Sequence, residues 1–272
     1  MEKIMNGKAH PWFIHKASKI DEFRLFIFHH AGGGATYYMP MLDQLSDGIS
    51  VYIMQLPGRE NRISDDMYDD LNHLIDDLTD ILLPYLDKPF AFFGHSMGAM
   101  ISFELTHILK KSYGISPEHL FLSSMCAPHL TKKINVKSLS DEQLLLKVFD
   151  LGGTGTEISR DQKLVSLILP TLRKDIKLCD DYYCNSAEAL NVPVTILGGH
   201  QDTAVLIGDL LEWDRYFKNA FHVCLFKGNH FYFREDYSML ASTIIKTIKN
   251  GKEAIRVELA EMNYKAGEDY HV

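Results

Sequence analysis

The segment GHSMGA, Gly94–Ala99, limits the possible folds more than any other part of the sequence. It follows the apolar run PFAFF and precedes MISFELTHILK, whose apolar residues have helical spacing. A serine bracketed by glycines between a strand and a helix is typical of a nucleophile elbow, a sharp turn that exposes the serine hydroxyl above a sheet. Gly94 and Gly98 have no Cβ atoms to collide where strand and helix come close. The segment therefore predicts Ser96 as a nucleophile, although a pattern with so few fixed positions also arises by chance.

Apolar runs alternate with helical patterns along most of the remaining chain. Nearly continuous apolar runs between helices indicate parallel strands, because the connecting helices cover both faces of the sheet. We therefore expect an α/β fold with a mostly parallel central sheet, formed as one domain over residues 1–272, with a charged tail from about residue 251. The expected strands span residues 22–30, 49–56, 89–93, 119–125, 192–199 and 220–228, and the expected helices span residues 71–85, 100–110 and 237–250.

The alternation is interrupted between about residues 131 and 185. In SLSDEQLLLKVFDLGG, Ser140 and Gln143 have the spacing of a helix capping box. DQKLVSLILPTLRKDIKLCDDYY predicts a second helix, broken or kinked at Pro170. Two helices without an intervening strand are what a helical lid inserted over the sheet would look like in sequence, and lids shape pockets and admit substrates. The alternative is additional helical packing with no such role.

Composition argues against several classes of protein. The chain of 272 residues has a formal net charge of -8 and no basic stripe, so nucleic acid is not an expected partner. It has no apolar run approaching the roughly 20 residues of a membrane span and no apolar signal-peptide core near its N-terminus, so we expect a cytoplasmic protein with no membrane partner. Four irregularly spaced cysteines are expected to be free thiols without a metal site: Cys126, Cys179, Cys184 and Cys224.

Three reactive side chains follow the ends of expected strands: Ser96, Asp202 and His230. Ligands of open parallel sheets bind beyond the carboxyl ends of the strands, and this chain order is that of the α/β-hydrolase catalytic triad. His230 would take the serine proton and later pass it to the leaving group, while Asp202 would hold the imidazole tautomer and stabilise its cation. His200 lies close to Asp202 in sequence and is an alternative that could instead sit at the rim.

The glycine loop AGGGA, residues 31–35, follows the first expected strand. Consecutive glycines allow backbone N–H groups to approach an anion, although a flexible connection explains the loop equally well on its own. It has neither the lysine of a Walker loop nor the G-x-G-x-x-G spacing of a dinucleotide site. An acyl-transfer site needs two oxyanion donors, and the expected pair is the backbone N–H groups of Met97 and Ala31.

Seven groups of segments together resemble the type II thioesterases that accompany nonribosomal peptide and polyketide synthetases. The resemblance extends from about residue 20 to residue 248, nearly the whole chain. The matching segments are FHHAGGGA, LPGRENR, FFGHSMGAM, CAPH, LGG with LPTLRKD in the expected lid, LGGHQD, and GNHFYF.

The resemblance implies the α/β-hydrolase fold and hydrolysis of acyl or aminoacyl thioesters on the phosphopantetheine arm of carrier proteins, for editing or release. By motif, it assigns Ser96, Asp202 and His230 as the triad, and Met97 and Ala31 as the oxyanion donors. It implies carrier-protein domains as partners and no cofactor of the protein's own, and we expect a monomer. An acidic carrier protein would need a basic surface, for which the candidates are Lys132, Lys133, Lys137, Arg173 and Lys174. A solvated helix face explains these five residues equally well.

Two other functions remain open at the level of sequence. A general carboxylesterase or acyltransferase could use the same scaffold and the same three side chains. A non-catalytic binding protein could also retain the fold, but the complete set of serine, aspartate, histidine and glycine loop argues against it.

Overall fold

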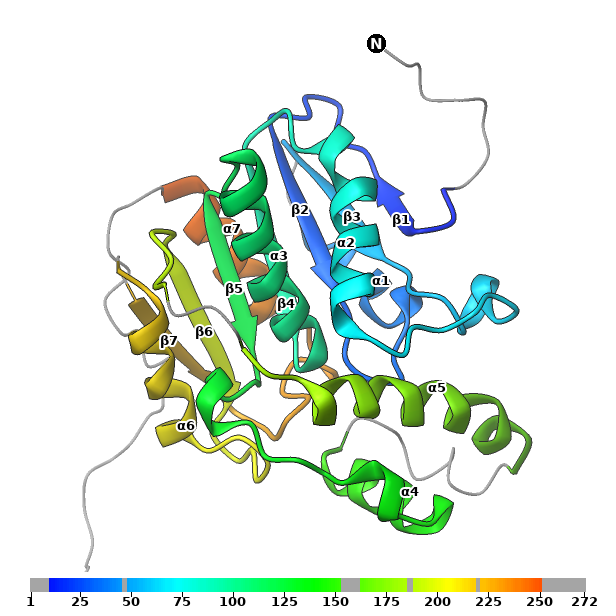
Figure 1. The fold of residues 1–272 in the computed structure, drawn as a ribbon. Coiled ribbons are helices and arrows are strands. Elements are labelled where there is room, and N and C mark those ends of the chain that lie inside the picture. The colour runs from blue at the N-terminus through cyan, green and yellow to red at the C-terminus, as the bar shows by residue number, and fades with distance from the viewer. Residues whose placement is uncertain (1–9, 46–47, 153–161, 185–187, 219–220, 251–272) are drawn as a thin grey trace, which may run out of the picture.

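A seven-stranded sheet runs through the centre of the molecule (Figure 1). The computed structural model describes residues 10–45, 48–152, 162–184, 188–218 and 221–250. The strand order is β1-β3-β2-β4-β5-β6-β7, and all neighbours are parallel except β1 and β3. The predicted mostly parallel sheet is therefore confirmed. The strands are β1 (Phe13–Lys16), β2 (Phe23–Phe28), β3 (Ile49–Met54), β4 (Phe90–His95), β5 (His119–Ser123), β6 (Val194–Gly199) and β7 (Phe221–Phe226).

Strand β1 is the one described strand that the sequence pattern did not predict. Its four residues, FIHK, include a single fully buried side chain, Phe13, so no apolar run marks it. It pairs antiparallel with β3 at the edge of the sheet, where Phe13 lies opposite Met54. At this edge the side chains from Ile14 to Lys16 are only partly covered or exposed, so the strand needs few apolar residues.

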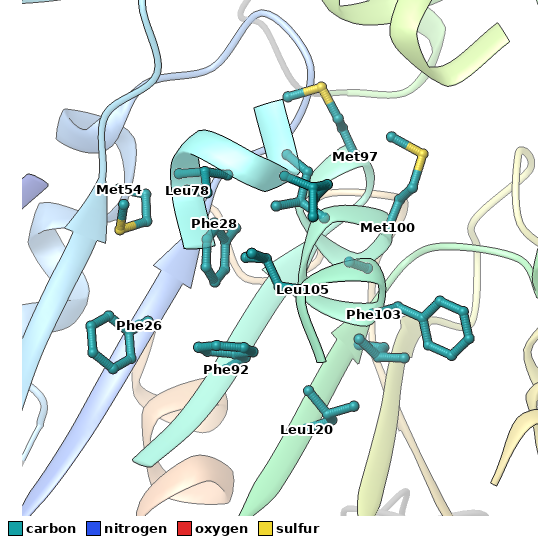
Figure 2. Close-up of a cluster of buried hydrophobic side chains, with 14 of the residues drawn as sticks. Phe26, Phe28, Met54, Leu78, Phe92, Met97, Met100, Phe103, Leu105 and Leu120 are labelled. Carbon is teal, nitrogen blue, oxygen red and sulfur yellow. The ribbon is translucent and has the colours of Figure 1, made fainter. Parts of the chain in front are cut away.

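One face of the sheet is covered by α2 (Leu71–Leu82), α3 (Met97–Tyr113) and the short α6 (Ile207–Leu211). Figure 2 shows Phe26, Phe28 and Phe92 from β2 and β4 gathered in one cluster with Leu78 of α2 and Leu105 of α3. Because side chains alternate along a strand, the residues between these phenylalanines point to the other face. This face holds the larger of the two cores that flank the sheet.

The opposite face is covered by α1 (Met39–Leu42) and α7 (Ser238–Asn250). Leu25, Ile27 and Phe93, which alternate with the phenylalanines of the first face, pack there against Met41 and Leu240. Six 3-10 helices connect parts of the described chain: Ala35–Tyr38, Glu60–Arg62, Leu83–Tyr85, Pro128–Leu130, Val136–Ser138 and Glu212–Tyr216. Within the described ranges, no helix is long and apolar enough to cross a lipid bilayer.

Two α-helices lie between β5 and β6 in the part of the chain that the structure describes, α4 (Asp141–Asp150) and α5 (Gln162–Asp181). The predicted capping box is confirmed: the Ser140 hydroxyl accepts the Gln143 N–H, and the Gln143 side chain accepts the Ser140 N–H. Of the predicted break or kink at Pro170, the break is wrong, because α5 continues through Pro170 as one helix. Buried Leu169 and Leu172 on either side hold the helix in place despite the missing N–H donor. The expected tail from residue 251 lies outside the described residues.

Candidate active site

Ser96 occupies a sharp turn between β4 and α3. Its φ of 54° and ψ of -117° lie outside the regions that L-residues favour, and its backbone N–H donates to the Ser123 carbonyl at 2.7 Å. The flanking glycines are sterically required. A Cβ on Gly94 would lie 2.0 Å from the Gly98 carbonyl oxygen, and one on Gly98 would lie 2.1 Å from the Phe28 carbonyl oxygen. The elbow geometry predicted from GHSMGA is therefore present.

Asp202 and His230 form a buried hydrogen bond, with 2.8 Å between Asp202 Oδ2 and His230 Nδ1. The other carboxylate oxygen, Oδ1, accepts the backbone N–H groups of Ala204 and Val205 at 2.9 and 3.1 Å. Burial by itself would raise the pKa of Asp202, but the hydrogen bond and charge of His230 and the two backbone donors outweigh burial and lower it. An ionised carboxylate only accepts hydrogen bonds, so Nδ1 carries the proton and Nε2 is left free to accept one.

The loops that carry these two side chains are tied together at the ends of neighbouring strands. The backbone N–H of Gln201 donates to the Gly228 carbonyl at 2.8 Å, which links the loop after β6 to the loop after β7. The Ser124 hydroxyl donates to the His230 carbonyl at 3.1 Å. His200, the alternative considered from sequence, bonds through Nδ1 to the Phe226 carbonyl at 3.1 Å and does not line the cavity described next.

A cavity of about 270 Å³ brings Ser96 and His230 together with Met97 and Ala31. Most of the other lining side chains are apolar, and many come from the inserted helices α4 and α5. A mostly apolar pocket of this kind suits an acyl chain. The apolar residues contributed by the insertion and its approach are Ile134, Leu145, Val148, Phe149, Leu151, Val165, Ile168, Leu172 and Ile176.

Within the described residues, the backbone N–H groups of the two predicted oxyanion donors have no acceptor. Among the hydrogen bonds of the described residues, none is donated by the backbone N–H of Ala31 or Met97. Four N–H groups that follow Ala31 are bonded: Gly32 to Asp175 Oδ2 (2.8 Å), Gly33 to the His30 carbonyl (3.0 Å), Ala35 to Gln55 Oε1 (2.7 Å) and Thr36 to Glu60 Oε1 (3.2 Å). The two N–H groups at the cavity wall are thus available to a ligand.

Two further histidines lie beside His230 and are held neutral. Burial, together with the neighbouring histidines, lowers the pKa of His30 and of His95 well below the ordinary value. The ring of His95 lies 5.2 Å from that of His230, and its Nδ1 is 2.8 Å from the Ser123 hydroxyl. Because neither neighbour carries a charge, His230 can become an imidazolium during catalysis without direct repulsion from them.

A second hollow of about 610 Å³ lies between α2, α3 and the end of α5. It is lined by residues such as Asp70, Glu104 and Tyr182 and includes none of the predicted catalytic side chains. The predicted catalytic residues therefore lie at the smaller cavity and not at this larger hollow.

Comparison with known proteins adds independent information. A family model described as a thioesterase domain matches residues 23–249. The chain is 36% identical to the linear gramicidin dehydrogenase LgrE of Brevibacillus parabrevis over 84% of this chain and 89% of that protein. It is 31% identical to the thioesterase PikA5 of Streptomyces venezuelae over 81% of this chain and 79% of that protein. The solved structure of the type II thioesterase BorB from the borrelidin biosynthetic cluster matches with a TM-score of 0.81 and 31% identity, covering 89% of this chain and 99% of that chain.

One relative is named a dehydrogenase, but the glycine loop of this chain does not have the sequence expected of a dinucleotide-binding loop. AGGGA lacks the G-x-G-x-x-G spacing of a dinucleotide site. The loop instead contributes the unbonded N–H group of Ala31 to a cavity that also holds Ser96, His230 and the N–H group of Met97. That arrangement suits acyl transfer rather than hydride transfer.

Proposed function

This chain belongs to the thioesterase family, and from that premise we propose that Ser96, His230 and Asp202 hydrolyse acyl thioesters carried on the phosphopantetheine arm of carrier-protein domains. The protein is a hydrolase of the α/β-hydrolase fold that acts on thioesters. The observation that best supports the residue roles is the 2.8 Å bond from Asp202 to a histidine that shares a cavity with Ser96.

The proposed reaction has two steps. His230 Nε2 accepts the proton of Ser96 Oγ while Oγ attacks the thioester carbonyl carbon, and the developing oxyanion is bound by the N–H groups of Met97 and Ala31. The C–S bond then breaks, and His230 returns the proton to the departing sulfur. In the second step His230 deprotonates water, which attacks the acyl carbonyl carbon. The bond from this carbon to Ser96 Oγ then breaks, Oγ takes the proton back from His230, and the carboxylic acid is released. No cofactor of the protein's own is needed, because the carrier delivers the thioester on its arm.

The insertion formed by α4 and α5 acts in this proposal as a lid that encloses the acyl group. Val148 of α4 lines the cavity, whereas Leu146 on the same helix is 57% exposed and does not. Val148→Trp should fill part of the cavity and lower the ratio of kcat/KM for octanoyl- over acetyl-carrier protein by about tenfold, the value of two buried CH2 groups. Leu146→Trp is the matched control, and an equal shift in both variants would count against an acyl pocket under α4.

The basic residues near the insertion are partly engaged within the protein. Arg173 bonds to Asp141, Lys174 pairs with Asp69, and Lys132 lies 3.4 Å from Asp209. Lys133 and Lys137 form none of the ion pairs within the described residues and line a hollow beside the insertion. We place the contact with an acidic carrier protein at these two lysines, since charges that are already paired contribute less to a new interface.

The preference for a carrier tests the substrate class. We expect kcat/KM for octanoyl-carrier protein to exceed that for p-nitrophenyl octanoate by about tenfold or more, because only the carrier substrate adds protein contacts that steer and orient the thioester. A strong preference for the free ester would favour a general carboxylesterase instead.

A charge-reversal variant separates docking from chemistry in the same assay. Lys133→Glu combined with Lys137→Glu should reduce kcat/KM for the carrier substrate, while hydrolysis of octanoyl-pantetheine, which has no protein part, remains as in the wild type. Equal losses on both substrates would place the lysines outside a docking surface.

A further inference from the structure

Asp175 on α5 lies against the turn formed by residues 30–33, which we call the oxyanion turn. Its carboxylate oxygen Oδ2 accepts the backbone N–H of Gly32 at 2.8 Å, and its side chain is 4% exposed, so water competes little for this bond. Leu172, one helical turn earlier, packs on the same glycine: a Cβ on Gly32 would lie 2.8 Å from Leu172 Cδ1. The inserted helix therefore holds the oxyanion turn by both a polar and an apolar contact.

Arg59 fixes the Asp175 carboxylate from the other side. Its two terminal nitrogens bond to the two carboxylate oxygens at 2.6 and 2.9 Å, in a bidentate pair that is almost completely buried. The same guanidinium also donates to the carbonyls of Gly33 and Pro57 at 3.0 and 3.1 Å. A buried ion pair adds little stability over apolar residues of similar size. The fully hydrogen-bonded pair of Arg59 and Asp175 therefore indicates a role other than stabilising the fold.

The oxyanion turn has the backbone geometry of a type II turn. The His30 carbonyl accepts the Gly33 N–H at 3.0 Å, and Gly32 has a φ of +72°, as the third residue of a type II turn requires. In the type I alternative, the central peptide between Ala31 and Gly32 is turned over. The Gly32 N–H would then point away from the Asp175 carboxylate. The acceptor on α5 therefore fits the type II form and anchors the turn at Gly32.

We propose that Asp175, held by Arg59, is a positioning residue that anchors the oxyanion turn through Gly32 and thereby holds the adjacent Ala31 N–H in place at the cavity wall. This inference rests on the proposed function, since it assumes that Ala31 donates to the oxyanion. Asp175 touches neither substrate nor nucleophile and acts only through Gly32. Because it belongs to the inserted helix, the oxyanion hole is complete only while α5 is seated on the turn.

Two double variants isolate the bond to Gly32 from the ion pair. Both replace Arg59 by methionine, which removes the buried cation, and they differ only at position 175: Asp175→Asn keeps an oxygen acceptor, whereas Asp175→Leu has a similar shape and no acceptor. We expect kcat for octanoyl-carrier protein to be about 30-fold lower in the leucine double variant than in the asparagine one, with KM within about threefold. Affinity for octylboronic acid, which forms a tetrahedral adduct with the serine, should fall by a similar factor.

Equal kcat values and equal boronate affinities in the two double variants would overturn the inference. A structural control is Thr171→Val, because the Thr171 hydroxyl anchors the same helix to the Gly58 carbonyl at 2.6 Å without touching the oxyanion turn. Its kcat should stay within about threefold of the wild type, and a loss as large as that of the leucine variant would also overturn the inference. A wild type that leaves carrier thioesters intact, or an active Ser96→Ala variant, would instead overturn the proposed function and this inference with it.

Discussion

Replacing Ser96 by alanine is expected to lower kcat for thioester hydrolysis by a factor on the order of 10⁶. The substitution removes the only atom that can form the acyl-enzyme in the proposed mechanism, and the remaining residues then have no nucleophile to activate. Its steric demands are small, because alanine carries the same Cβ as serine in the turn. The measurement is release of free acid from octanoyl-carrier protein, followed over single and multiple turnovers.

Ser102→Ala provides the matched control for this substitution. Ser102 lies one and a half turns further along the same helix, is fully buried, and donates its hydroxyl to the Gly98 carbonyl at 2.8 Å. It does not line the cavity, so its loss should leave kcat within about threefold of the wild type. If Ser96→Ala kept most of the activity while folding normally, Ser96 would be excluded as the nucleophile.

Asp202→Asn is expected to reduce kcat by about 10⁴-fold with little change in fold. The structure fixes which way the new amide would face. The oxygen must remain where Oδ1 accepts the N–H groups of Ala204 and Val205, because an NH2 group there would oppose two donors. The NH2 group therefore faces His230 Nδ1 and forces the proton onto Nε2. In that tautomer the imidazole cannot accept the proton of Ser96.

The control for Asp202 is a neighbouring aspartate that also accepts a backbone N–H group. Asp209 accepts the Leu206 N–H at 3.1 Å and lies outside the cavity. Asp209→Asn should keep kcat within about threefold of the wild type. Comparable activities of Asp202→Asn and Asp209→Asn would show that the buried carboxylate does not set the tautomer of His230.

Local sequence patterns were sufficient for much of this architecture. The elbow at Ser96 was predictable because glycine spacing, an apolar run and a helical pattern agree within a short stretch of chain. The parallel strands were predictable because buried strands have nearly continuous apolar runs. Asp202 and His230 were identified by their positions after such strands. In the structure, Asp202 Oδ2 lies 2.8 Å from His230 Nδ1.

Features that depend on distant contacts were not predictable from local patterns. The continuity of α5 through Pro170 depends on the packing of Leu169 and Leu172, which outweighs the local preference of proline. Arg59 and Asp175 are separated by 116 residues, and neither belongs to a pattern with a known chemical role. Both lie in segments that carry the family resemblance, LPGRENR and LPTLRKD, but nothing in these segments indicates that the two side chains pair.

Titration of the enzyme with a fluorophosphonate, followed by peptide mapping and assay on octanoyl-carrier protein, tests the central claim most directly. An activated serine reacts with this reagent, whereas ordinary serines do not. The mechanism predicts one phosphonyl group per chain, located on Ser96, with thioester hydrolysis lost in proportion to labelling. Full labelling of Ser96 with unchanged hydrolysis, or inactivation by labelling at another residue, would contradict it.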